Sequence, residues 1–185
     1  SLGGTALLKW LSEKPDANPL SAAVAVSVPF CLEQVANSIH CGFSRVYERR
    51  LTGCLQRALL DKIDRFGERM PVCREQVRKL NDFWSFDDAV TAPLHGFVDA
   101  RDYYTKASAR QFLPGIKTPT LILQAKDDPF MTPAVIPSEN EISDSTRLEV
   151  SENGGHVGFV YGRWPWRVRF WLPDRIATYL NEHIR

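Results

Sequence analysis

The sequence lacks an excess of charge of either sign, and this lack excludes one large class of functions. Its 185 residues include 23 basic and 22 acidic side chains, which gives a formal net charge of +1. A nucleic-acid-binding protein needs a clustered basic face, so we expect no nucleic-acid partner. The chain also lacks an apolar run of about 18 residues, the length that crosses a bilayer, and a basic-then-apolar leader at its start. We therefore expect no transmembrane segment and a cytoplasmic location.

Cysteine is scarce, and its spacing fits no metal site. The four cysteines never form a C-x-x-C pair, and the four histidines do not interleave with them as zinc ligands would. We therefore expect no metal site, and we predict reduced thiols that fill small spaces in the core rather than a disulfide. These cysteines are Cys31, Cys41, Cys54 and Cys73.

The remaining composition is that of an ordinary globular chain, and its apolar pattern predicts an α/β fold. Hydrophobic residues make up 44% of the sequence and charged residues 24%, and the length favours one domain. Continuous apolar runs at Ala22–Val28 and Thr118–Ala125 are typical of strands buried on both faces of a parallel sheet. Arg147–Val150 predicts a third, shorter strand. Apolar residues recur with helical spacing in 2–14 and 173–185, so a helix is expected at each end of the chain.

The segment between the two long strands is expected to be helical. In residues 31–80, apolar side chains recur every three or four positions and predict one long or broken amphipathic helix. Arginines and lysines along it would suit a phosphate-binding face. Acidic residues such as Glu48 and Asp61 are mixed among them at helical spacing, which favours a solvated, charge-laced face instead.

Three polar positions stand where a sheet fold would place functional groups. Ser1 opens the first helix, Asp127 and Asp128 follow the strand at 118–125, and His156 follows the third strand between glycines. The order Ser, Asp, His is that of α/β-hydrolases. A neutral histidine can take the proton of a serine hydroxyl, and a carboxylate fixes the tautomer of that histidine.

Each of these residues has a structural alternative. Ser1 could cap the helix that begins at Leu2, and Asp127 and Asp128 before a proline could be turn formers. Taken together, in this order and each beside a sheet element, they favour the catalytic interpretation.

Four motifs in the same order resemble those of the YheT-like esterases of the α/β-hydrolase superfamily, from Ser1 almost to the end of the chain. S-L-G-G-T-A-L-L-K at 1–9 is similar to the second half of that family's nucleophile elbow, which reads G-F-S-L-G-G before a Leu-rich helix. T-A-P-L-H-G-F at 91–97, D-D-P-F-M at 127–131 and G-G-H-V-G-F at 154–159 resemble the other three.

The resemblance implies an α/β-hydrolase fold and a serine esterase that acts on short- to medium-chain acyl esters. It implies a triad of Ser1, Asp128 and His156, with the Leu2 N–H in the oxyanion hole, no metal and no cofactor. Asp128 is preferred as the acid because the superfamily places that residue three positions beyond a small one, here Ala125. Asp127 is then expected to point away and cap the turn. A helical lid is implied at about 31–108, within one domain that spans 1–185.

The departures from the family predict a fragment. Everything before the elbow serine is missing, including the early strands and the second oxyanion-hole donor, so we expect the isolated 185 residues to be inactive. An acyltransferase of the same fold and a non-catalytic binding module stay open as alternatives. An N-terminal nucleophile hydrolase is a further alternative, but it requires stacked antiparallel sheets.

The tryptophan-rich segment 161–171 has two interpretations. It could be a lipid-facing patch that gives peripheral membrane contact, or it could cover the core beside the last helix, which we favour.

Overall fold

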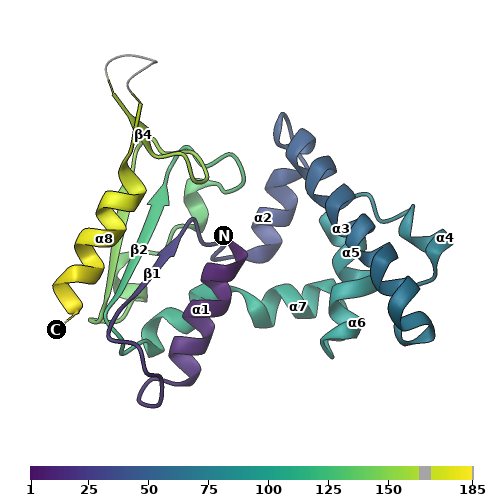
Figure 1. Ribbon diagram of the computed structural model, residues 1–185, viewed down its shortest axis with the longest axis horizontal. Coiled ribbons are helices and arrows are strands. Elements are labelled where there is room, and N and C mark those ends of the chain that lie inside the picture. The colour runs from purple at the N-terminus through teal and green to yellow at the C-terminus, as the bar shows by residue number, and fades with distance from the viewer. Residues whose placement is uncertain (163–167, 185) are drawn as a thin grey trace. The chain divides into compact units, whose positions relative to one another are not determined.

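The computed structural model describes residues 1–162 and 168–184, and the chain forms two compact units. Ser1–Cys31 and Ser108–Arg185 together form the first, called the sheet unit, and Leu32–Ala107 form the second, called the helical unit. The colour gradient of Figure 1 separates them, since the helical unit is the blue-to-teal part of the chain. The helical unit is thus an insertion between two strands of the sheet.

The sheet unit contains a parallel sheet in the order β1-β2-β3, as the sequence predicted. Its strands are β1 (Ala23–Val26), β2 (Thr120–Ala125) and β3 (Thr146–Ser151). Every residue of β2 is buried, because this strand is central and has a helix against each face. All three strands lie within or around the predicted apolar runs, so the α/β fold class is confirmed.

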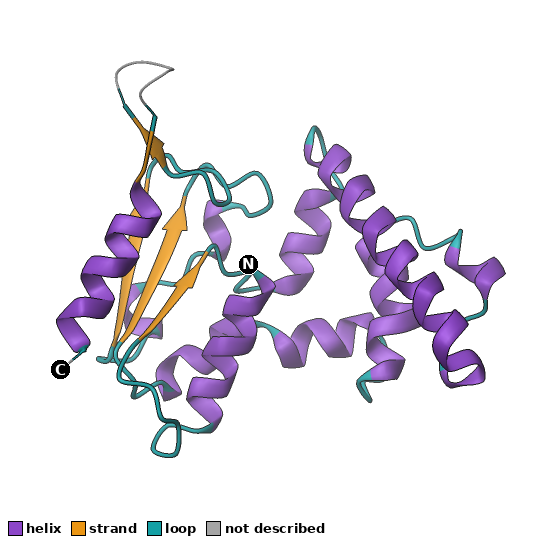
Figure 2. Cartoon of the chain, viewed as in Figure 1, coloured by secondary structure: helices purple, strands orange, loops and turns teal. Residues whose placement is uncertain are grey.

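Two helices cover the sheet, one on each face. Figure 1 and Figure 2 show α1 (Leu2–Glu13) on one face and α8 (Trp171–His183) on the other. Successive side chains of a strand point to opposite faces. Ile122 therefore packs with Leu8 of α1, whereas its neighbour Leu123 packs with Tyr179 of α8. The α1 side is completed by the 3-10 helix η3 (Ala109–Gly115).

A short antiparallel pair, which the sequence did not predict, leads into α8. It consists of β4 (Val160–Tyr161) and β5 (Arg169–Phe170). Trp171 stacks on Phe159 with ring centroids 5.8 Å apart and packs with the α8 side of the core. That contact fits the core-cover interpretation for this residue, while Trp164 and Trp166 lie outside the described residues.

Short 3-10 helices complete the sheet unit, and broken helices make up the helical unit. The sheet unit also contains η4 (Pro133–Val135) and η5 (Glu139–Glu141). The elements of the helical unit are α2 (Leu32–Ile39), α3 (Ser44–Phe66), η1 (Gly67–Arg69), α4 (Arg74–Val77), α5 (Phe83–Phe86), the π-helical turn η2 (Asp87–Thr91), α6 (Ala92–Leu94) and α7 (Ala100–Ala107). The predicted amphipathic helix is therefore broken, first at Gly42, whose φ is +58°.

A half-buried carboxylate, Asp87, links the π-helical turn η2 to α7. The Thr91 hydroxyl donates to Asp87 Oδ1 at 2.6 Å, and the Tyr104 hydroxyl donates to Asp87 Oδ2 at 2.8 Å. Burial raises the pKa of Asp87, and burial beside this carboxylate raises the pKa of Tyr103 to about 12. Thr91 belongs to the T-A-P-L-H-G-F motif, so this network gives part of that motif a structural role.

Two expectations about the helical unit and its start are wrong. The four cysteines are free, but Cys41, Cys54 and Cys73 are exposed and only Cys31 is half-buried. Cys41 lies in the turn after α2, Cys54 on the exposed face of α3 and Cys73 at the start of α4. At these positions the thiols fill no space in the core. Glu48 is not solvated, because it is buried and accepts a hydrogen bond from the Phe83 N–H at 3.4 Å.

None of the helices in the described part of the chain is long and apolar enough to cross a membrane.

Candidate active site

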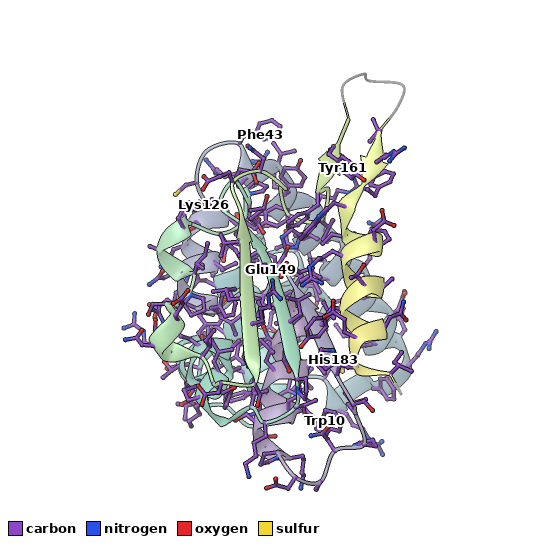
Figure 3. All side chains as sticks on the ribbon, turned by 90° about the vertical axis from the view of Figure 1, so that its left-hand side faces the viewer. Trp10, Phe43, Lys126, Glu149, Tyr161 and His183 are labelled. Carbon is purple, nitrogen blue, oxygen red and sulfur yellow. The ribbon has the colours of Figure 1, made fainter. Side chains whose placement is uncertain are left out.

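The predicted site residues lie at one end of the parallel sheet. Parallel strands all end on the same side, and loops after those ends carry functional groups in α/β folds. Lys126, the first residue after β2, marks this end in Figure 3, and Trp10 near the end of α1 lies toward the opposite end. Asp128 follows β2, and His156 follows β3.

Asp128 and His156 are in direct contact. The His156 Nδ1–H donates to Asp128 Oδ2 at 2.8 Å. The Asp128 side chain is fully buried, and 17% of the His156 side chain is exposed. A carboxylate bound at Nδ1 keeps the proton on that nitrogen and leaves Nε2 free to accept one. The pair therefore has the arrangement of a general base and the residue that orients it.

Hydrogen bonds hold both oxygens of the Asp128 carboxylate, one from its own loop and one from His156. The Phe130 N–H donates to Asp128 Oδ1 at 2.9 Å, so Oδ2 is the oxygen left for the histidine. The Phe130 ring also meets the His156 ring edge-on, with centroids 4.6 Å apart. Backbone, carboxylate and aromatic ring together fix where the imidazole lies.

The loop after β3 depends on its glycines, as expected from the sequence. Gly155 has φ +57°, the left-handed region that glycine adopts without strain. A Cβ added to Gly154 would lie 2.7 Å from the Phe159 ring and 2.9 Å from the Ala125 Cβ. The Phe159 N–H closes the loop by donating to the Gly154 carbonyl at 2.8 Å.

Ser1 lies at the start of α1, beside the end of β1. Its nitrogen donates to the carbonyl oxygen of Val26, the last residue of β1, at 2.7 Å. Leu2 is the first residue of α1, where backbone N–H groups have no intrahelical acceptor.

The parallel sheet argues against the N-terminal nucleophile alternative, which requires stacked antiparallel sheets. Strand β1 pairs with β2 in parallel orientation, and β2 pairs with β3 in the same way.

Three polar residues in or directly beyond the strands make contacts that the sequence did not predict. Asp127 accepts hydrogen bonds from the N–H groups of Gly154 and Gly155, at 2.8 and 2.7 Å. The Ser27 hydroxyl donates to the His156 carbonyl oxygen. Buried Gln124 accepts from the Val28 N–H at 3.1 Å. A polar side chain inside or directly after an apolar run was the available signal for all three.

Side chains that could ligate a metal do not gather in the part of the chain that the structure describes. There, no three His, Cys, Asp or Glu side chains lie close enough together to hold a metal ion.

The chain matches one protein-family model and is similar in sequence to several known proteins. The family model described as alpha/beta hydrolase fold matches residues 1–162. “Putative esterase YheT” of Escherichia coli (strain K12) is 39% identical over 184 residues, which cover 100% of this chain and 54% of that protein. “Monoacylglycerol lipase” of Saccharomyces cerevisiae is 30% identical, covering 98% of this chain and 41% of that protein. “Phospholipase ABHD3” of Mus musculus is 33% identical, covering 89% and 40%. The chain thus spans about half the length of these relatives or less.

Proposed function

Because this chain belongs to the α/β-hydrolase family, we propose that it carries the catalytic triad of a serine esterase. The names of its relatives support ester hydrolysis as the general activity. The observation that carries the proposal is the hydrogen bond from His156 to the buried Asp128 carboxylate, at the sheet end where α1 begins with Ser1. In this proposal Ser1 is the nucleophile, His156 the general base and Asp128 the residue that orients it.

The reaction follows from these roles. His156 Nε2 takes the proton of the Ser1 hydroxyl as Ser1 Oγ attacks the ester carbonyl carbon, and a tetrahedral intermediate forms. The intermediate collapses, the bond to the alcohol oxygen breaks, and the imidazolium returns the proton to the departing alcohol. Water then attacks the acyl-serine with the same base, which releases the carboxylic acid and restores Ser1.

The start of α1 is the proposed source of oxyanion stabilisation. The Leu2 N–H is the first of the helix, and a helix N-terminus carries a partial positive charge that favours a developing oxyanion. In this proposal the Leu2 N–H is the hydrogen-bond donor that residues 1–185 contribute to the oxyanion hole. The superfamily takes a second from a loop before the nucleophile.

We propose a small-molecule acyl ester as substrate, and we propose the helical insertion as the lid that the family resemblance implies. The lipase and phospholipase names of the relatives support esters of lipid-like acids. The helical unit is inserted between β1 and β2, both of which end at the site.

A hydrolysis assay tests the proposal. It uses a chain extended upstream of Ser1 through a Gly-x-Ser elbow, called the extended chain below, with p-nitrophenyl acetate and butyrate as substrates. We expect Ser1→Ala and His156→Ala each to lower kcat by about 10³-fold or more. Ser21→Ala, which alters an exposed serine in the loop before β1, is the control and should leave kcat unchanged. A Ser1→Ala variant that hydrolyses both esters at the unaltered rate would disprove the proposed nucleophile.

A further inference from the structure

The backbone on the N-terminal side of His156 is held by a carboxylate outside the proposed triad. Asp127 Oδ1 accepts from Gly154 N–H at 2.8 Å and from Gly155 N–H at 2.7 Å, the two residues directly before His156. A bond in which the acceptor is charged is about twice as strong as a neutral one. Asp127 is exposed, so its side chain adds nothing to the packed core, and this pair of bonds is its contact with the histidine loop.

The carbonyl of His156 is held from a different strand. The Ser27 hydroxyl donates to the His156 carbonyl oxygen. Ser27 is fully buried, directly after β1, and has φ +52°, a left-handed conformation that is strained for a residue with a side chain. Such strain persists where the surrounding structure requires it, often at functional sites.

We propose that Asp127 and Ser27 are positioning residues that clamp the backbone of His156 so that its imidazole meets Asp128. Asp127 fixes the residues before the histidine, and Ser27 fixes the histidine's own carbonyl. The adjacent carboxylates of one turn thus have separate tasks, one on the histidine backbone and one on its ring. The inference rests on the proposed function, because a positioned histidine matters only if it acts as the base.

The geometry gives the expected size of the effect. Without Asp127, the Gly154 and Gly155 N–H groups lose their carboxylate acceptor, and the His156 ring can move relative to Asp128 and the nucleophile. A misplacement of about 1 Å can lower a rate by about 10²-fold. The substrate does not touch Asp127 in this proposal, so the loss should fall on kcat rather than on KM.

Two substitutions of Asp127 in the extended chain separate positioning from charge. Asp127→Ala removes the acceptor and should lower kcat by about 10- to 100-fold with KM within about twofold of the unaltered value. Asp127→Asn keeps an oxygen that can accept both N–H groups, so it should restore kcat to within about threefold. Ser27→Ala keeps the strained backbone but loses the hydroxyl, and it should lower kcat by about 3- to 10-fold.

A matched control and a spectroscopic signal complete the test. Glu152→Ala removes an exposed carboxylate of the histidine loop itself, one that pairs with Lys126, and should leave kcat unchanged. The low-field proton NMR signal of the His156 Nδ1–H should persist in Asp127→Asn and weaken in Asp127→Ala. An Asp127→Ala variant with unaltered kcat and an unaltered signal would overturn the clamp. A kcat in Asp127→Asn as low as in Asp127→Ala would overturn it too, by assigning the effect to charge.

The Ser1→Ala and His156→Ala variants distinguish failure of the clamp from failure of the proposed function. If both are inactive while Asp127→Ala and Ser27→Ala keep full kcat, the triad stands and the clamp is wrong. If Ser1→Ala or His156→Ala keeps full activity, the proposed function itself is wrong. If Asp127→Ala does not fold, Ser27→Ala with the same readouts decides the question.

Discussion

Changing Asp128 to asparagine should abolish catalysis by reversing the tautomer of His156. The Phe130 N–H requires an acceptor and donates to Asp128 Oδ1 at 2.9 Å, so the oxygen of the introduced amide should face Phe130. The amide NH₂ then faces His156 Nδ1, where the structure has a donor at 2.8 Å. Two donors cannot bond to each other, so Nδ1 must become the acceptor and the proton must move to Nε2. An Nε2 that already carries a proton cannot take one from Ser1.

The size of the loss follows from the proton's position. A comparable substitution of a triad aspartate lowers kcat by about 10⁴-fold, which corresponds to about 5.4 kcal/mol in the activation free energy. Asp128 is fully buried and the amide has nearly the same volume. The extended chain should therefore keep its fold, and the loss should appear in kcat.

The assay measures kcat and KM for p-nitrophenyl butyrate in the Asp128→Asn and Asp127→Asn variants of the extended chain. Melting temperatures within a few degrees of the unaltered protein exclude unfolding as the cause. We expect Asp128→Asn to be crippled and Asp127→Asn to remain within about threefold. The reverse outcome, an active Asp128→Asn and a crippled Asp127→Asn, would refute the assignment of the acid.

Three further predictions concern stability. Gly154→Ala should lower the free energy of unfolding by about 1–3 kcal/mol, measured by urea titration, because its Cβ would lie 2.7 Å from the Phe159 ring; an unchanged midpoint would contradict the tight approach. Hydrogen bonds from Arg175 lower the pKa of Glu149, so this pair stabilises the fold above the carboxyl's ordinary pKa, and the contribution disappears as pH falls through the lowered value. Glu149→Gln should thus lose about 1 kcal/mol near neutral pH and progressively less in acid, and an equal loss at both pH values would contradict the ion pair. The isolated 185 residues should aggregate or show negligible esterase activity, because β1 is the edge strand of an apolar sheet; a monomeric, fully active 185-residue protein would contradict this.

Local pattern was sufficient to predict the sheet and its helices. The runs at Ala22–Val28 and Thr118–Ala125 are mostly apolar on both faces, which is typical of a strand that helices cover on both sides. The helix spacing at each end of the chain was equally local. The short β4–β5 pair carries no such pattern, since two-residue strands contain no repeat to detect.

Contacts between distant residues could not be predicted in the same way. Ser27 stands inside an apolar run, and its partner His156 is 129 positions away. Asp127 was expected to cap its own turn, yet its oxygen accepts from the glycines of another loop. Glu48 was expected on a solvated face by its spacing, but Phe83 N–H binds it in the interior of the helical unit. Each of these contacts depends on how the elements pack.

Covalent labelling of Ser1 tests the central claim most directly. The extended chain is treated with a fluorophosphonate, which phosphonylates an activated serine and releases fluoride, and the modified peptide is identified by mass spectrometry. The account predicts one adduct, on Ser1, and none in His156→Ala, because the hydroxyl then has no base. An adduct on another serine, or a Ser1 adduct that forms equally fast without His156, would contradict the triad.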